Sequence, residues 1–130
     1  MVDRILIDDF NLKAKQFAAK WKNLVRKATH LKHYNTLSDE ALIGINTGMY
    51  PLLSKTLDRG LDRSVTGGFF VNIGKTRMQE GYPLSEVIYA VSLAQDVTIE
   101  YIMTEFAPES PVKMYQSMDV VSKISEFFLL

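Results

Sequence analysis

His30 and His33 are the residues whose types and spacing most directly suggest chemistry in this sequence. Three residues apart on a helix, the two imidazoles could share a metal ion or offer a ligand to haem. No Glu-x-x-His motif accompanies them, however, and no histidine follows residue 33 to serve as the axial ligand of a globin-type haem. We therefore expect no metal and no cofactor, and we interpret both histidines as residues of a solvated helix end.

Catalysis needs a nucleophile, a base and a group that orients them, and the sequence offers little for these roles. Cysteine is absent, which excludes thiol catalysis and thiolate metal sites. There is no Gly-x-Ser-x-Gly motif, and the Gly67-Gly68 pair lacks the Lys-Ser/Thr that follows the glycines of a phosphate-binding loop. We predict no catalytic residue, and we interpret Gly67-Gly68 as a turn.

Charged residues are segregated along the chain, although 15 basic and 15 acidic residues give a net charge of zero. Residues 10–38 hold seven basic residues and no acid, whereas residues 79–112 hold six acids and no base. The basic run alone would suggest a phosphate-binding stripe. Contact between two complementary faces, within the fold or across a homodimer, explains both runs more simply. We therefore expect no nucleic-acid partner.

The composition is that of a globular domain, with 47% hydrophobic and 23% charged residues. No window approaches the roughly 18 apolar residues of a membrane-spanning helix, and the N-terminus lacks an export signal. We expect no membrane insertion and a cytoplasmic location. Residues 1–130 are interpreted as one domain, either complete or the N-terminal part of a longer protein, because the apolar helical pattern runs on to Leu130.

Apolar residues at helical spacing predict the elements that position these side chains. Five helices are expected, and they cover approximately residues 10–28, 38–60, 64–80, 84–106 and 111–130. Ser38 and Ser110 are expected N-caps, Gly60 and Gly81 expected stops, and Pro51 should kink or break the second helix. A turn and a short strand are the alternative for residues 66–73. The fold class is thus all-α, a bundle of about five helices or a globin-like packing.

Tyrosines on otherwise apolar faces suggest a binding pocket, because a mostly apolar pocket needs a few fixed polar groups. Six tyrosines occur in the chain, and ordinary core packing with the hydroxyls at the rim explains them equally well. The candidate ligand-binding residues are Tyr50, Arg77, Tyr82, Thr98 and Tyr101.

The segment GKTRMQEGYPLSEVI, residues 74–88, resembles the Gly-x-x-Arg-x-x-x-Gly-x-Pro-Leu-x-Glu pattern of the N-terminal domain of RsbR-type stressosome co-antagonists. Trp21 with Val25-Arg26, Leu37-Ser-Asp-Glu40 and Leu52-Leu53 also look like that family, so the resemblance covers most of residues 14–106. It implies an all-helical input module that senses a ligand or binds a partner, globin-like without haem in some members.

Within this motif, Gly74 is expected to permit close helix approach, and Pro83-Leu84-Ser85 to supply the next cap. Arg77 is the motif residue whose chemistry exceeds folding, because a guanidinium near a buried face needs a carboxylate or a ligand anion. Arg77 could form an ion pair with Glu80 or contact a ligand, and the sequence leaves both alternatives open.

The functional hypothesis is a non-catalytic signalling input domain of a bacterial stress or sensor regulator. It would pass ligand or partner binding to an output domain or regulatory protein through the last helix, and it would form a homodimer. The predicted interface has heptad-like spacing and consists of Met114, Met118, Val121, Ser125 and Phe128. The alternative is a stand-alone protein-interaction module without a small-molecule ligand, and a haem- or metal-binding sensor ranks third.

Overall fold

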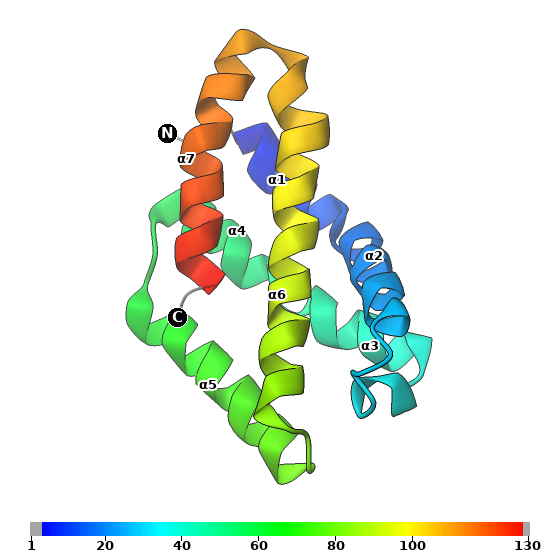
Figure 1. The fold of residues 1–130 in the computed structure, drawn as a ribbon. Coiled ribbons are helices and arrows are strands. Elements are labelled where there is room, and N and C mark those ends of the chain that lie inside the picture. The colour runs from blue at the N-terminus through cyan, green and yellow to red at the C-terminus, as the bar shows by residue number, and fades with distance from the viewer. Residues whose placement is uncertain (1–3, 129–130) are drawn as a thin grey trace.

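The computed structural model describes residues 4–128, and every regular element in that range is a helix (Figure 1). This confirms the all-α fold class. Short 3₁₀ turns occur at Tyr34–Thr36 and Ala107–Glu109, and a π-helical turn at Ile102–Phe106. The α-helices are α1 (Arg4–Leu12), α2 (Ala14–Lys27), α3 (Asp39–Thr47), α4 (Tyr50–Arg59), α5 (Arg63–Gln79), α6 (Leu84–Tyr101) and α7 (Pro111–Phe128).

All five predicted segments are helical, but the first two are each divided. The first is interrupted at Lys13, between α1 and α2, and the second at Gly48-Met49, between α3 and α4. Pro51 then lies in the first turn of α4, where its missing N–H removes no helical hydrogen bond. The second predicted segment is therefore broken just before Pro51 and is not one helix kinked at that residue.

The third predicted segment forms α5, so the alternative of a turn and a strand is wrong. The Asp62 side chain caps this helix by accepting a hydrogen bond from the Val65 amide at 3.1 Å. Gly67-Gly68 lies inside α5, which corrects its interpretation as a turn. Glycine costs about 1 kcal/mol relative to alanine in a helix interior, a penalty that the cap and the remaining residues of α5 outweigh.

The predicted helix ends are mostly confirmed. The Ser38 and Ser110 hydroxyls accept hydrogen bonds from the amides of Ala41 and Lys113. Gly60 and Gly81 have φ of 93° and 92°, the left-handed backbone that favours glycine after a helix. Ser85 is not a cap, because α6 begins at Leu84 directly after the extended backbone of Pro83.

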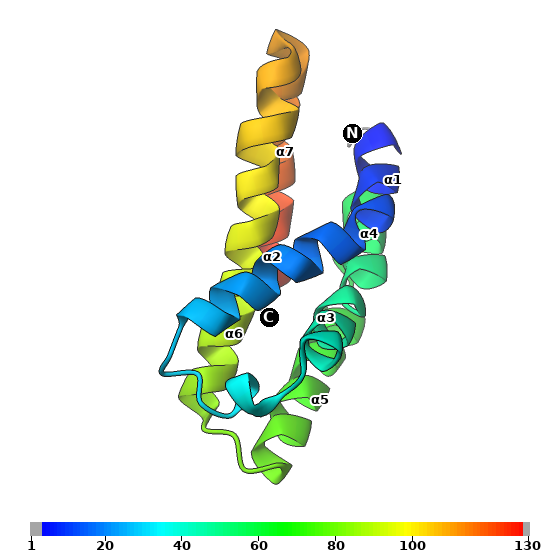
Figure 2. The same ribbon diagram turned by 90° about the vertical axis from the view of Figure 1, so that its right-hand side faces the viewer.

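The helices form two layers. α6 and α7 lie side by side as an antiparallel pair in both views, and α1, α3, α4 and α5 lie on the other side in Figure 2. α2 crosses between the layers and packs against both α3 and α6. α5 runs diagonally below the pair, and α6 is the helix that it contacts most among the described residues.

Aromatic rings fill the core where α1, α2, α4 and α6 meet. The Phe17 ring is central, because its centroid lies 5.4 Å from those of Phe10 and Tyr50 and 5.1 Å from that of Tyr101. Trp21, one turn further along α2, donates from its indole N–H to the Ala90 carbonyl at 2.9 Å. The apolar stripe predicted for residues 10–28 thus faces the core.

α5 and the start of α6 depart from the expected burial. Leu84 and Ile88 are apolar residues four apart at the start of α6, yet they are 52% and 59% exposed. In α5, Thr66 is the residue that is buried, and the apolar side chains are at most partly covered. A methyl group built at Gly74 would meet no atom within 4 Å, so close helix approach does not explain that glycine.

Replacing Trp21 by Ala should lower the free energy of unfolding by about 3–5 kcal/mol, because a large buried side chain leaves a cavity. Lys20→Ala, at the neighbouring exposed position, should change it by less than about 0.5 kcal/mol. Chemical denaturation followed by circular dichroism measures both. An unchanged midpoint for Trp21→Ala would contradict the orientation of α2.

Candidate functional site

Three of the five predicted ligand residues are buried in the core and form hydrogen bonds within the protein. Tyr50 donates to Asn46 Oδ1 at 2.8 Å, and Tyr101 donates to Asp9 Oδ2 at 2.8 Å. The Thr98 hydroxyl donates to the Gln95 carbonyl of its own helix at 2.9 Å. Burial raises the pKa of the Tyr50 phenol well above its usual value, opposed by the hydrogen bond to Asn46. Their polar atoms therefore have protein partners.

Arg77 and Tyr82, the other two predicted residues, lie together at the junction of α5 and α6. Arg77 Nη1 donates to Glu80 Oε1 at 2.8 Å, and the guanidinium carbon lies 5.8 Å from the centre of the Tyr82 ring. The Tyr82 ring contacts Tyr34 at a centroid distance of 4.9 Å. The Nε atom of Arg77 is buried without a hydrogen-bond partner among the described residues.

His33 and Glu86 connect this junction to the segment between α2 and α3. Glu86, 6% exposed, accepts hydrogen bonds from the His33 amide at 3.0 Å and pairs with His33 Nδ1 at 2.5 Å. His30 packs edge-on against Tyr89, with ring centroids 4.5 Å apart. The interpretation as a solvated helix end is wrong for His33, because its backbone amide and its ring both pair with the carboxylate of Glu86. The buried carboxylate of Glu86 requires such hydrogen-bonding partners.

Tyr34 lies between the polar junction and an apolar cavity. Burial raises the pKa of its phenol, and the nearby positive charge of Arg77 opposes that rise. Its ring also packs edge-on against Trp21, with centroids 6.2 Å apart. Tyr34 and Trp21 both line a narrow cavity of about 40 Å³ between α2, α3, α5 and α6.

A second apolar cavity of about 240 Å³ opens between α5, α6 and the end of α7. The two cavities share the side chains of Phe70, Ile73, Val91 and Phe128 as a common wall. Sequence reasoning missed Phe70, Ile73 and Val91, since apolar residues at helical spacing look like ordinary core. Phe128 was predicted to face a partner, yet it packs against Phe70 and Phe127.

The other predicted interface residues of α7 divide between groove and surface. Met114 and Met118 are 57% and 71% exposed, and with Val121 they line an apolar groove beside Met103 and Pro108. Ser125 is partly buried further along the helix.

The basic run of residues 10–38 and the acidic run of residues 79–112 form few ion pairs with each other among the described residues. Lys22 and Arg26 form ion pairs with Asp39, which precedes the acidic run, and Lys13 pairs with Asp9. Among the ion pairs of residues 4–128, His33–Glu86 is the one that joins the two segments.

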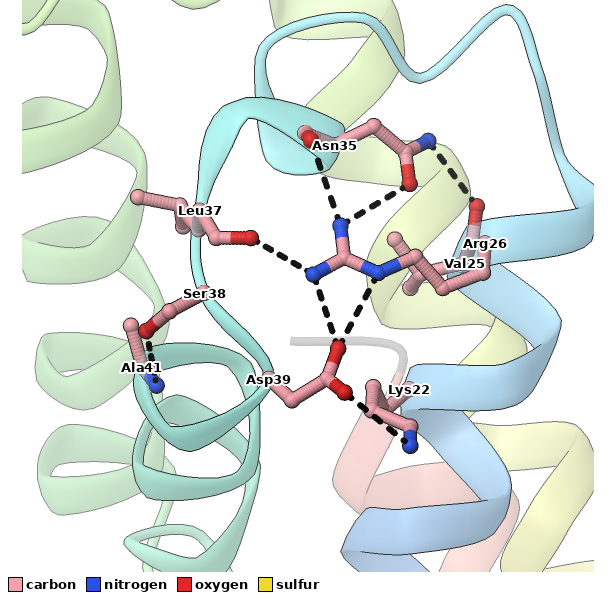
Figure 3. A network of polar contacts seen from close by, with 8 residues as sticks. All are labelled: Lys22, Val25, Arg26, Asn35, Leu37, Ser38, Asp39 and Ala41. Carbon is pink, nitrogen blue, oxygen red and sulfur yellow. Dashed lines mark hydrogen bonds and ion pairs between the residues drawn. The ribbon is translucent and has the colours of Figure 1, made fainter.

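Arg26 fixes the segment that carries His33 and Tyr34 (Figure 3). Its guanidinium donates to the Leu37 carbonyl at 2.6 Å, to the backbone carbonyl and side chain of Asn35, and to Asp39 Oδ1 at 2.9 Å. Asn35 in turn donates to the carbonyls of Val25, Ala28 and Leu31.

No helix within residues 4–128 is long and apolar enough to cross a membrane, and no group of three or more potential metal-binding side chains occurs in that part of the chain. Comparison with family models, with curated proteins and with solved structures found no match.

Replacing Arg26 by Gln should lower the free energy of unfolding by about 1–3 kcal/mol, because carbonyls of the α2–α3 segment lose a charged donor. The hydrogen bond from Arg26, reinforced by Lys22, holds the pKa of Asp39 below its usual value. A depressed carboxyl pKa stabilises the fold above the unfolded pKa, and this contribution is lost as the pH falls through the folded pKa. NMR titration should find a higher Asp39 pKa in Arg26→Gln.

Lys27→Gln is the matched control, because Lys27 is the exposed neighbour with the same charge. It should leave both the Asp39 pKa and the stability nearly unchanged. Equal effects of the two variants would show that net charge, not the hydrogen bonds of Figure 3, is responsible.

Proposed function

We propose that this chain is a non-catalytic input domain of a bacterial, cytoplasmic stress or sensor regulator, and that it responds to a small apolar ligand. The pair of apolar cavities that share one wall of side chains carries this proposal. The resemblance of residues 74–88 to RsbR-type input domains supports it independently of the cavities.

The ligand enters only if the shared wall moves. The cavities measure about 40 and 240 Å³, and together they fall slightly short of the roughly 300 Å³ of a small ligand pocket. Rotation of Phe70 and Phe128, or an outward shift of α5, would join them. α5 suits such a movement because Thr66 is its fully buried residue and its apolar side chains remain partly exposed.

The same wall links the cavities to α7. The Phe70 ring lies 5.3 Å from Phe127 and 6.1 Å from Phe128, so two helices meet at this aromatic contact. A ligand that displaces Phe70 must therefore change the packing at the end of α7. That change is the signal we propose, and α7 is the helix expected to carry it.

The groove on the outer face of α7 favours a second candidate, in which the domain acts by binding protein through Met114 and Met118. Flexible methionine side chains adapt to varied partners, and exposed apolar surface of this kind commonly marks an interface. A homodimer through this groove is compatible with the input-domain proposal, because α7 would then join two sensors.

Ile73→Trp should abolish binding of the fluorescent apolar probe 1-aminoanthracene, because the larger ring in the shared wall takes up space on both of its sides. Val71→Trp adds the same group to the same helix at a 54% exposed position and should leave binding intact. Titration followed by probe emission measures the two affinities, and thermal melts confirm that both variants fold. Absence of probe binding to the wild type would contradict the proposal.

Met118→Asp should convert a dimer into a monomer at high micromolar concentration, because a carboxylate placed in the apolar groove is costly to desolvate. Analytical ultracentrifugation measures the change, and Ser122→Asp, at an exposed position on the same helix, is the control. A wild-type protein that is monomeric at this concentration would rule out the homodimer.

A further inference from the structure

A second, polar cleft lies between the end of α4 and the start of α5, around the turn at Gly60. Its volume is about 800 Å³, within the range of roughly 300–1,000 Å³ that is usual for small-molecule sites. Three cationic side chains line it, and they are Lys55, Arg59 and Arg63. Apolar surface also lines it, contributed by Leu52, Leu61 and Val65.

The residues that line the cleft carry more positive than negative charge, because three cationic side chains face the one carboxylate of Asp62. Asp62 is committed to the cap of α5, where it accepts from the Val65 amide, and Asp58 lies 3.9 Å from Arg59. Lys55 and Arg63 have no ion-pair partner among residues 4–128. Two unpaired cations facing one cleft favour a ligand that carries two negative charges.

Backbone donors of α5 reinforce this charge. The first intrahelical hydrogen bond of this 17-residue helix runs from the Thr66 amide to the Asp62 carbonyl. The amides of Arg63 and Ser64 precede that bond, so no helical carbonyl can accept from them. Amides at a helix N-terminus are a common anion-binding arrangement in proteins.

Thr66 provides an observation that is independent of the helix terminus. The residue is fully buried, it lines the cleft, and its hydroxyl has no hydrogen-bond partner within the described part of the chain. A buried hydroxyl without a partner lowers the stability of the fold. A ligand that accepts a hydrogen bond there would remove that cost.

We propose that this cleft binds a small organic phosphate, a phosphomonoester with an apolar or aromatic body. Its dianionic phosphate binds Lys55, Arg63 and the first amides of α5, and its oxygens accept from the Thr66 hydroxyl. Its carbon body packs against Leu52, Leu61 and Val65. This site is separate from the apolar cavities and does not depend on the input-domain proposal.

Isothermal titration with AMP, adenosine and inorganic phosphate tests the site in the full chain. AMP should bind, adenosine should bind at least tenfold more weakly, and inorganic phosphate should compete with AMP. Lys55→Gln and Arg63→Gln should each weaken AMP binding about tenfold or more. Lys75→Gln, which removes the same charge from an exposed position of α5, should leave it unchanged.

Several outcomes would overturn this proposal. They are the absence of AMP binding, equal binding of adenosine, and equal loss in Lys75→Gln and Lys55→Gln. A single-stranded oligonucleotide that binds more tightly than AMP would instead assign the cations to nucleic acid. Ile73 does not line the cleft, so Ile73→Trp should leave AMP binding measurable, and this test and that of the apolar cavities can fail separately.

Thr66→Val separates a ligand contact from a structural role. The substitution keeps the side-chain shape and removes the unpartnered hydroxyl, so the ligand-free protein should be at least as stable as the wild type. AMP affinity should nevertheless fall several-fold. Unchanged affinity would exclude Thr66 from the site.

Discussion

Arg26 sets the shape of the segment on which the neighbouring contacts depend. The segment between α2 and α3 has few helical hydrogen bonds of its own, and carbonyls left unpaired near the core would be costly. Arg26 donates to the carbonyls of Asn35 and Leu37, and Asn35 donates to that of Val25 at the end of α2 (Figure 3). Asn35 also donates to the carbonyls of Ala28 and Leu31. With the segment fixed, His33 reaches Glu86 and Tyr34 reaches Trp21 and Tyr82.

Local features of the sequence predicted much of the fold. The stripe through Phe17 and Trp21 required α2 to be buried on one face, and Ser38 and Gly60 defined helix ends through local backbone chemistry. The helix break at Lys13 was not predicted, because the apolar pattern continues across it, whereas the break at Gly48-Met49 lies just before Pro51, where a kink or a break was expected. Periodicity shows which residues face the core and not where a helix is interrupted.

The candidate site was predictable only where its residues are close in the sequence. Arg77 and Tyr82 belong to one short motif, and they meet across the α5–α6 turn. The contact of Phe70 with Phe128 joins residues far apart in the chain, so no local pattern could show that Phe128 turns inward. The basic residues at α4 and α5 were missed because Gly60 separates them and neither helix alone carries a cluster.

α5 combines features that are unfavourable for a purely structural helix. Among the described residues, the two buried polar side-chain atoms without partners are Thr66 Oγ1 and Arg77 Nε, near its two ends. Between them, Gly67, Gly68 and Gly74 have open space where a methyl group would fit, so packing does not require these glycines. Few buried contacts and unsatisfied polar atoms place α5 among the elements of lowest local stability.

That low stability connects the two proposed sites physically. α5 forms part of the apolar cavities through Phe70 and Ile73, and its first turn forms part of the polar cleft. A ligand that binds only when α5 is displaced would therefore alter the affinity of the other site. Thermodynamic linkage makes the effect reciprocal, because each ligand changes the binding of the other by the same factor. Such coupling needs one helix that can occupy two positions relative to the rest of the fold. α5 is suited to this because few of its side chains are buried.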